Sequence, residues 1–376
     1  MIEIWDKNTI NELNQLDIAE WFDIYNNGLV EDRGFSLSNP QILSIRKKIK
    51  SDYEEYLSNC VHDSNFHSYY VFKNEEGKIV SICRIVRKSP DYYLEGLETH
   101  RDYYYKGFAS KLVNNLMQIL VREDINVIYS QVRNHNIASI NFHKNIGFVL
   151  SDVNQTDTIF KLDIESHLRK TLFNDWASTY NQSVHKSDIE NTYPFAGYSK
   201  IQKHIFDRCK EMPNARILEM GIGTGLMTWK LYGLEYDITG VDISEEMIKQ
   251  AKIIMPLNKY VLSDFKSVNI KLDSKKYNVI IFSYSIHHMK PINQKYMLDV
   301  LSSKLDDDGI IIIGDVMTKS NEEMKKLSVQ VGKYWDDEEY YPTLEFYNNQ
   351  VLKQHYDISF HKVSFCGGII ELKKKR

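Results

Sequence analysis

The stretch ILEMGIGTG, residues 217–225, decides the fold of the second half of this 376-residue chain. It joins an apolar run, ARILEMG, to a helical pattern, TGLMTWKLYG, and its glycines let backbone approach a ligand closely. From residue 215 onward apolar runs alternate with helical patterns (DITGVDI, SEEMIKQAKII, KYVLSD, YNVIIFSYSI, a helix near 293–305, GIIIIGDVM). This alternation predicts a parallel α/β sheet covered on both faces. The last segments, DISFHKVSF and GGIIELKKK, predict an antiparallel hairpin that closes the sheet edge.

Carboxylates stand where the neighbouring strands of this predicted sheet end. Asp242 ends the strand after the glycine loop, where a carboxylate accepts both hydroxyls of a ribose. Asp264 follows the third strand, at the height of an adenine amino group, and Glu219 directly precedes the loop. A GxGxxG loop would indicate a dehydrogenase, but this loop reads Gly-x-Gly-x-Gly after a glutamate. Another nucleotide-binding Rossmann-like domain is the alternative.

These elements together resemble the class I S-adenosylmethionine-dependent methyltransferases over about residues 170–376. The resemblance implies a Rossmann-like seven-stranded sheet with an antiparallel terminal hairpin, and a lid of helices over about 168–211. It also implies that Tyr180, in the lid, contacts the cofactor or acceptor. The implied cofactor contacts are Glu219, the loop glycines Gly221, Gly223 and Gly225, Asp242 at the ribose, and Asp264 with Phe265 around adenine.

The fourth predicted strand leads into the methyl-acceptor side of this site. Ser283 stands at its carboxyl end, where open α/β sheets bind ligands, and we include it among the cofactor contacts. The pair His287-His288 follows, as in small-molecule members of the family; we select His287 as general base, with a capping or packing role as the alternative. Adjacent histidines lack the spacing of metal ligands on a helix, so no metal is predicted. Nucleophile motifs typical of base or rRNA methylation are missing.

The first half of the chain has a different order of elements. A helix is predicted over residues 40–60. A hairpin is predicted from HSYYVFKN and KIVSICRIVRK, and a further strand from YYLEGLETH. The turn YYYKGFA then opens a helix over 108–123, and its small residues let backbone amides converge on an anion. A strand, INVIYSQV, and a short helix, ASINFHKNI, follow.

This half resembles the GNAT superfamily of acetyl-CoA-dependent N-acetyltransferases over roughly residues 1–162, which implies a mixed α+β domain. The phosphate-binding loop of the family matches at Gly107 and Ala109, with Tyr104 where the family has Arg or Gln. The other implied contacts of the CoA cofactor are Thr99 and Asn136.

The same resemblance suggests the groups that handle protons. His143 falls where the family often has a tyrosine that protonates the leaving thiolate; a helix-surface histidine is the alternative. Glu98 is our preferred base, acting through water, with a surface carboxylate as the alternative. Glu95 lies three positions away, so on a regular strand it points to the opposite face and only one of the two faces the cleft. The resemblance also implies a bulge in this strand, where the backbone opens to bind the acetyl group.

Composition excludes several classes of protein. Lys plus Arg is 47 against 51 Asp plus Glu, a formal charge of −4, which argues against nucleic-acid binding. No apolar run is long enough to cross a bilayer, and four scattered cysteines fit a reducing cytoplasm.

We therefore expect an α/β enzyme of two domains, 1–165 and 166–376, that acetylates and methylates small molecules with acetyl-CoA and S-adenosylmethionine. One alternative is a methyltransferase regulated by a non-catalytic CoA-binding domain. Another is an enzyme that modifies proteins.

Overall fold

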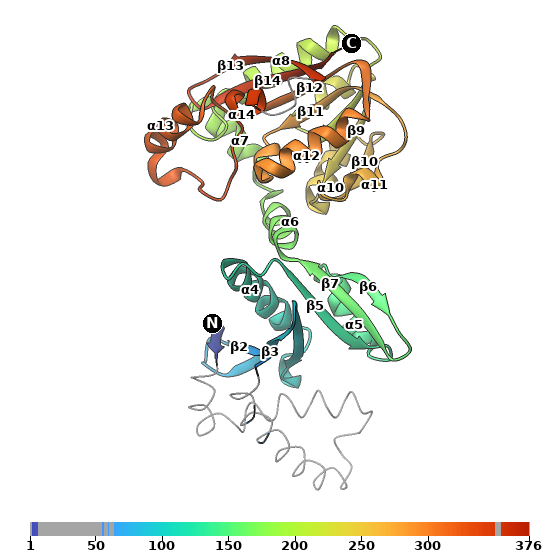
Figure 1. The fold of residues 1–376 in the computed structure, drawn as a ribbon, viewed down its shortest axis with the longest axis vertical. Coiled ribbons are helices and arrows are strands. Elements are labelled where there is room, and N and C mark those ends of the chain that lie inside the picture. The colour runs from blue at the N-terminus through green and yellow to red at the C-terminus, as the bar shows by residue number, and fades with distance from the viewer. Residues whose placement is uncertain (1, 7–54, 56–58, 60–63, 350–354, 376) are drawn as a thin grey trace. The chain divides into compact units, whose positions relative to one another are not determined.

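The computed structural model describes residues 2–6, 55, 59, 64–349 and 355–375 (Figure 1). The chain forms two compact units, Met1–Leu168 and Arg169–Arg376, and each is described here by itself. The sequence places the division near 165. The helix predicted over 40–60 falls outside the described residues.

The first unit is built on a seven-stranded sheet in the order β1-β2-β3-β4-β5-β7-β6. All its neighbouring strands pair antiparallel except β4 and β5, which are parallel. The strands are β1 Ile2–Trp5, β2 Phe66–Lys73, β3 Ile79–Lys88, β4 Asp91–Thr99, β5 Val127–Arg133, β6 Val149–Val153 and β7 Asp157–Asp163. The helices are η1 Arg101–Tyr103, α4 Phe108–Arg122 and α5 Ile137–Asn145.

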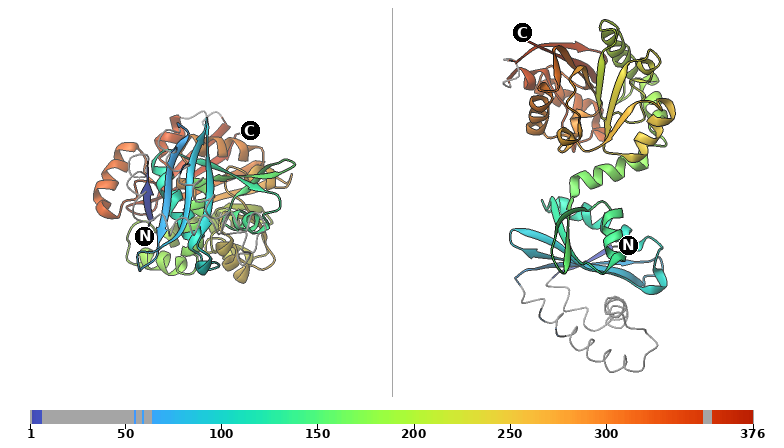
Figure 2. Two further views of the ribbon diagram at one scale, coloured as in Figure 1. Left: turned by 90° about the horizontal axis from the view of Figure 1, so that it is seen from below. Right: turned by 90° about the vertical axis from the view of Figure 1, so that its right-hand side faces the viewer.

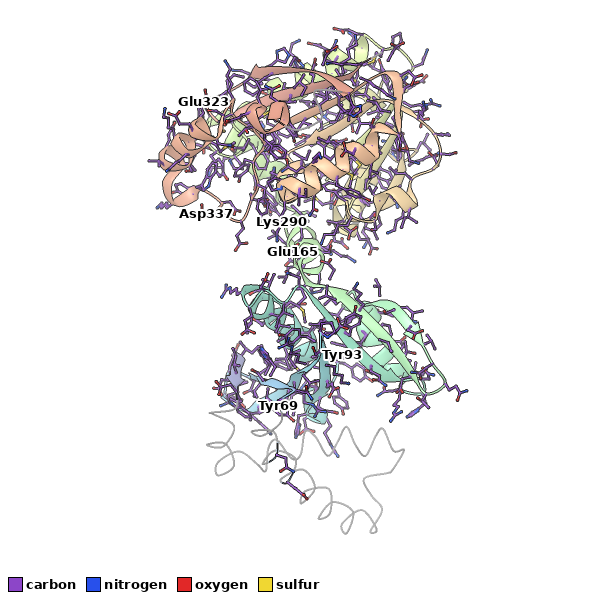
Figure 3. All side chains as sticks on the ribbon, viewed as in Figure 1. Tyr69, Tyr93, Glu165, Lys290, Glu323 and Asp337 are labelled. Carbon is purple, nitrogen blue, oxygen red and sulfur yellow. The ribbon has the colours of Figure 1, made fainter. Side chains whose placement is uncertain are left out.

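Helix α4 forms the main core of this unit against the sheet. Its buried residues recur at helical spacing, Leu112, Val113, Leu116, Met117 and Leu120, and they contact buried residues of β3, β4 and β5. Side chains fill the space between helix and sheet (Figure 3). A continuous apolar core therefore fixes the position of α4 on strands β3, β4 and β5.

The second unit has a seven-stranded sheet in the order β10-β9-β8-β11-β12-β14-β13. Its first five strands are parallel, and β14 and β13 add the antiparallel hairpin that the sequence predicts. The strands are β8 Arg216–Met220, β9 Asp237–Asp242, β10 Lys259–Leu262, β11 Tyr277–Ser283, β12 Leu305–Val316, β13 Tyr356–Lys362 and β14 Gly367–Lys374. The longer helices are α6 Ile164–Trp176 (whose first residues belong to the first unit), α7 Tyr180–Ile189, α8 Tyr198–Lys210, α10 Glu245–Ile254, α12 Pro291–Ser302 and α13 Asn321–Val331. Shorter helices are α9 Trp229–Tyr232, α11 Val268–Lys271, η2 Ile286–His288, η3 Gly332–Tyr334 and α14 Leu344–Asn349.

Both faces of this sheet are covered, as the apolar strands require (Figures 1 and 2). Helices α11, α12 and α14 pack on one face and α7, α8 and α13 on the other. The helix predicted from TGLMTWKLYG is shorter than expected, since only Trp229–Tyr232 is helical. Thr228, just before it, directs its hydroxyl to Glu219 rather than capping the helix.

Among the helices of the described ranges, none combines the length and the apolar character needed to cross a membrane.

Candidate active sites

The glycine loop after β8 adopts a backbone that side chains disfavour. Gly221, Gly223 and Gly225 have φ of 79°, 53° and 81°, in the left-handed region. A Cβ at Gly221 would lie 2.5 Å from Cβ of Ser285, and one at Gly225 would lie 2.5 Å from the Met255 methyl. The loop therefore needs glycine at 221 for two separate reasons, its φ and the close approach of β11's end.

Asp242 lies beside this loop at the end of β9. Its Oδ2 accepts the Gly223 N–H at 2.8 Å and its Oδ1 accepts the Ser244 N–H at 2.9 Å. Burial raises the pKa of Asp242 to about 6, against the lowering effect of these backbone hydrogen bonds. The Ile243 N–H is a third backbone donor to this carboxylate, so the backbone does not take all of its lone pairs.

Glu219 is almost fully buried, with 1% of its surface exposed, on the side of β8 that faces α8. Its Oε2 accepts the Thr228 hydroxyl at 2.6 Å. Burial, and to a smaller extent the nearby Asp242, raise the pKa of Glu219 to about 8 against the lowering effect of the Thr228 hydrogen bond. A cation beside this carboxyl group would favour its charged form.

Helices α6 and α7, in the segment predicted as a lid, contact the glycine loop and the start of α10. The Ser244 hydroxyl donates to Asn174 Oδ1 at 2.7 Å, and the Thr224 hydroxyl donates to Asn181 Oδ1 at 2.6 Å. Tyr180 packs edge-on against Trp176, with ring centroids 4.9 Å apart. Two amide side chains that the sequence reasoning missed thus fasten the lid to the cofactor loop and to the start of α10.

The remaining predicted cofactor residues lie at the same edge of the sheet. Asp264 Oδ1 accepts the Ser267 N–H at 2.8 Å, which fixes the turn after β10. Phe265 packs edge-on against Phe282 of β11, with centroids 6.0 Å apart. Ser283, buried, ends β11.

His287 is paired with a carboxylate that the sequence reasoning missed. Its Nδ1 lies 2.7 and 2.9 Å from the two oxygens of Asp315, which is fully buried on β12. Because a carboxylate only accepts, Nδ1 carries the hydrogen and Nε2 keeps its lone pair. Burial alone would lower the pKa of His287, but the charge and hydrogen bond of Asp315 outweigh it and raise the pKa. This is the arrangement of a general base.

A second pair lies next to it. His288 Nδ1 is 2.8 Å from Oε1 of Glu339, and the His287 and His288 ring centroids are 4.1 Å apart. Burial and the neighbouring His287 lower the pKa of His288 to about 4, against the effect of Glu339. His287, His288 and Glu339 offer three ligand atoms within 4.8 Å of one another. Spacing in the sequence predicts no metal at these two histidines, and the structure brings Glu339 to them from a distant segment.

An aromatic wall borders His287. The Tyr341 ring lies 5.4 Å from it, Trp335 lies 4.8 Å from Tyr341, and the Tyr193 and Tyr341 hydroxyls are hydrogen-bonded. Tyr193 lies in the segment predicted as a lid, whereas Trp335 and Tyr341 come from the segment before the terminal hairpin. A single Asp after the isoleucine run GIIIIGDVM was a signal that could have found Asp315, whereas Glu339 stands in an acidic run without such a mark.

In the first unit, β4 and β5 pair only at their beginnings. The register joins Tyr92 to Ile128 and Tyr93 to Tyr129, and no further pair follows although β4 continues to Thr99. The two strands therefore separate, and the backbone groups of their later residues form no ladder hydrogen bonds with each other. Gly107, with φ of 78° and no side-chain cap, starts the 15-residue α4, and Ala109 lies in its first turn. Its first N–H groups lack intrahelical partners and favour an anion.

A β-bulge places Glu95 and Glu98 on one face of β4. Glu95 opposes Arg84 and Glu98 opposes Ile82, so three steps on β4 match two on β3. The extra residue is accommodated near Gly96, whose φ is 56°. The expectation for a regular strand, opposite faces, is therefore wrong. Glu95 is bound by Arg84 at 2.9 Å and by Lys88, and these two cations hold the pKa of Glu95 low against the effect of burial.

His143 is buried, with 3% of its surface exposed, and stacks on Phe160. Its Nδ1 lies 2.8 Å from the Ser139 carbonyl and therefore carries the hydrogen, while Nε2 is buried without a partner among the described residues. Burial lowers the pKa of His143. To act as the predicted general acid, His143 would need a second proton, on Nε2. Burial disfavours this charged form of the ring.

The other predicted contacts of the acetyl cofactor are placed as follows. The Thr99 and Ser81 hydroxyls lie 3.0 Å apart, and the Asn136 side chain accepts the Ser139 N–H at 3.0 Å as the N-cap of α5. Tyr104 is half-buried just before Gly107.

Two family models match the chain, one in each half. The model of the acetyltransferase (GNAT) family covers residues 37–148, and a methyltransferase domain model covers residues 197–355. Together these matches define a methyltransferase domain joined to a GNAT domain.

The relatives agree with this class. An uncharacterized methyltransferase of Alkaliphilus oremlandii is 32% identical over 43% of this chain and 74% of its own length. A second, from Oceanobacillus iheyensis, is 24% identical over 54% of this chain and 96% of its own. The chain belongs to this methyltransferase family. A solved magnesium protoporphyrin IX methyltransferase from Synechocystis, with bound S-adenosylhomocysteine, aligns over 56% of this chain and all of its own at 15% identity and a TM-score of 0.43.

Proposed function

We propose that the chain is a bifunctional transferase that methylates and N-acetylates small molecules, with both reactions on one metabolite or in one pathway. The observation that carries the methyl-transfer half is the meeting of Glu219, the glycine loop and Asp242 with the His287–Asp315 pair at one edge of the sheet. For the acetyl-transfer half it is the parting of β4 and β5 beside the free N-terminus of α4. A formal charge of −4 favours small molecules over nucleic acids as acceptors.

For S-adenosylmethionine we assign each end of the cofactor to a carboxylate. The buried Glu219 pairs with its ammonium group, which supplies the missing positive charge near this acid. Asp242 accepts the ribose hydroxyls with the lone pairs that Gly223 and Ser244 leave unused. Asp264 and Phe265 border the adenine. The ammonium group and the ribose hydroxyls of the cofactor would thus give the buried Glu219 and Asp242 their partners at the carboxyl ends of β8 and β9.

For methyl transfer we assign His287 as the base. A lone pair of the acceptor oxygen or nitrogen attacks the methyl carbon, the carbon–sulfur bond breaks, and S-adenosylhomocysteine leaves. The acceptor proton passes to Nε2 of His287, and Asp315 stabilises the resulting imidazolium. Tyr193, Trp335 and Tyr341 supply an apolar wall, which suits an acceptor with an aromatic or aliphatic part.

For acetyl transfer we assign the open backbone of β4 to the thioester. Unused N–H groups there polarise its carbonyl, and the first turn of α4 binds the pyrophosphate of CoA. The acceptor amine loses a proton through water to Glu98, attacks the carbonyl carbon, and the CoA thiolate leaves. The ion pairs of Glu95 with Arg84 and Lys88 hold it in its charged form and disfavour it as the base.

Cofactor binding tests the methyltransferase assignment most directly. Asp242→Ala is expected to abolish calorimetrically detectable S-adenosylmethionine binding. Asp237→Ala is a matched control, because Asp237 begins the same strand and is exposed. Equal affinities in the two variants would refute the ribose assignment.

Acetyl transfer is tested with radiolabelled acetyl-CoA and a panel of small amines. We expect transfer by the wild type, a loss of about 100-fold in Glu98→Gln, and little change in Glu95→Gln. The buried, neutral His143 favours the rival view, in which this unit binds CoA only to regulate the methyltransferase. Binding of CoA without transfer to any amine would support that view.

A further inference from the structure

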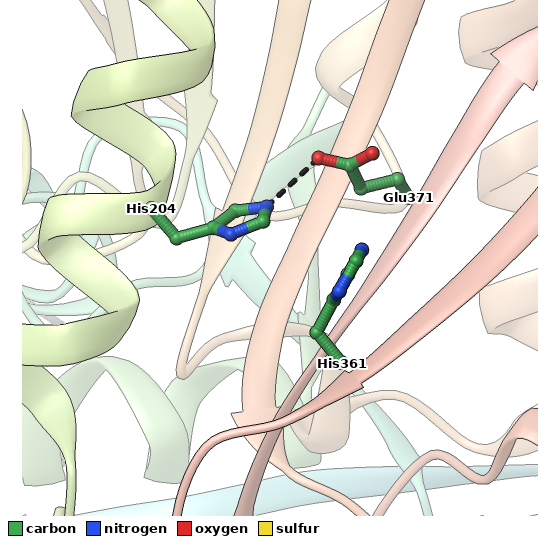
Figure 4. Close-up of side chains that lie close together, drawn as sticks. All are labelled: His204, His361 and Glu371. Carbon is green, nitrogen blue, oxygen red and sulfur yellow. Dashed lines mark hydrogen bonds and ion pairs between the residues drawn. The ribbon is translucent and has the colours of Figure 1, made fainter.

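A second cluster of metal-ligand side chains lies away from the methyl-transfer site, between α8 and the terminal hairpin. His204 on α8, His361 on β13 and Glu371 on β14 point toward one another (Figure 4). Each offers one ligand atom, and these atoms lie within 4.8 Å of one another. Three different elements thus contribute one ligand each.

Part of this cluster is an ion-pair network. Glu371 Oε1 accepts both His204 Nε2 and Arg208 Nε at 2.8 Å. Burial would raise the pKa of Glu371, but these two partners outweigh it and lower the pKa. Both bonds go to Oε1 of Glu371, and Oε2 is engaged in neither.

The ion-pair network does not account for His361. Its ring lies 5.0 Å from that of His204, centroid to centroid, yet no hydrogen bond or ion pair to it occurs among the described residues. An exposed histidine on an edge strand has ample room to point to solvent instead. Its position beside a buried carboxylate and a second imidazole indicates a common ligand for the three.

We propose that His204, His361 and Glu371 bind a divalent transition-metal ion of the zinc type. Two imidazoles and one carboxylate form a donor set of zinc sites and suit magnesium poorly. Ligand atoms around tetrahedral zinc lie about 3.3 Å apart, given bonds of about 2 Å. The exposed His361 closes the remaining distance by rotating its side chain. Arg208 lowers the affinity by its charge, so the site is weaker than a closed structural zinc site.

The ion would fasten the terminal hairpin to α8. The turn of this hairpin already holds the segment before α8, because the Ser364 hydroxyl donates to the Ala196 carbonyl at 2.6 Å. A bound ion therefore stabilises the side of the methyltransferase unit that carries the lid segment around Tyr193. Its role is structural and independent of the methyl-transfer chemistry.

The test uses the full chain after EDTA treatment and gel filtration. Calorimetry with zinc chloride is expected to give one ion per chain with a micromolar Kd and no binding of magnesium. Saturating zinc raises the melting temperature by about 5 °C. Cobalt, added in place of zinc, gives the intense visible bands of a four-coordinate site.

Two variants separate the site from adventitious binding. His361→Ala, at an exposed position where folding is not at risk, is expected to weaken zinc binding at least tenfold and to remove the cobalt bands. His355→Ala is the matched control, an exposed histidine just before the same strand, and leaves both unchanged. Zinc binding that is absent in the wild type, or equal in wild type and His361→Ala, would overturn the proposal. S-adenosylmethionine affinity, measured in parallel, reports separately on the proposed function.

Discussion

Glu219→Gln gives the sharpest test of the cofactor assignment, because it removes a charge and keeps the shape. Burial raises the pKa of Glu219 from 4.5 to about 8. At about 1.4 kcal/mol per pH unit, ionising this group in the protein without cofactor costs about 5 kcal/mol more than in the unfolded chain. The proposed ammonium group of S-adenosylmethionine offsets this cost, so cofactor binding and deprotonation of Glu219 are coupled.

The coupling appears as protons released on binding. With a pKa of about 8, roughly 0.9 of Glu219 is protonated at pH 7, so binding should release nearly one proton. Calorimetry at pH 7 in buffers of different ionisation enthalpy measures this number. Glu219→Gln is expected to release close to none, and to bind about tenfold more weakly at pH 8 after losing a charged hydrogen bond. The exposed Asp237→Asn should behave as wild type. Equal proton release by Glu219→Gln and wild type would refute the reasoning.

The same group affects stability without cofactor. Since the folded pKa is raised, the folded state holds a proton between about pH 4.5 and 8 that the unfolded state has lost. Stability of the wild type therefore falls as pH rises through this window, by up to about 1.4 kcal/mol per pH unit. Melting temperatures of Glu219→Gln should vary less from pH 5 to pH 8. A parallel decline in both proteins would show that Glu219 ionises normally.

Three further predictions concern other residues. Asp315→Asn should lower the methyl-transfer rate about 100-fold with unchanged S-adenosylmethionine affinity. Because Asp315 raises the pKa of His287, the variant should also shift the acidic limb of the pH–rate profile to lower pH. An acidic limb that does not move argues against this pair as the base. Gly221→Ala should destabilise the protein by about 2 kcal/mol or more, and Gly223→Ala by about 1 kcal/mol. Both substitutions strain a positive φ, but only the one at Gly221 adds a clash with Ser285. Chemical denaturation measures both losses of stability, and equal losses contradict this geometry. Gly107→Val should weaken CoA binding at least tenfold and leave methyl transfer intact, because valine strains the positive φ at the start of α4. A CoA affinity equal to that of the wild type would show that this turn does not bind CoA.

Short-range patterns in the sequence were enough for the outline of both units. The alternation of apolar runs and helices after residue 215 predicts the parallel sheet, and DISFHKVSF with GGIIELKKK predicts the hairpin β13–β14. The glycines at 221, 223 and 225 and the carboxylate at 242 occur at strand ends, which parallel topology brings to one edge. The one clear failure among these elements is α9, where Thr228 bonds to Glu219 across the loop.

The histidine–carboxylate pairs of the candidate site are decided by the tertiary structure. His287 and Asp315 are 28 residues apart, and His288 and Glu339 are 51 apart, so no local pattern links them. Their pKa values follow from burial and from partners supplied by other elements, which no spacing in the sequence reveals.

Glycines, carboxylates and apolar periodicity are properties of neighbouring residues, and so the sequence by itself determined the two units, the glycine loop and the residue types around each cofactor. The face shared by Glu95 and Glu98, the parting of β4 and β5 and the histidine–carboxylate pairs depend on strand register and on how distant elements pack. A single bulged residue reverses which side of a strand the following side chains occupy, and only the folded chain fixes where that residue lies.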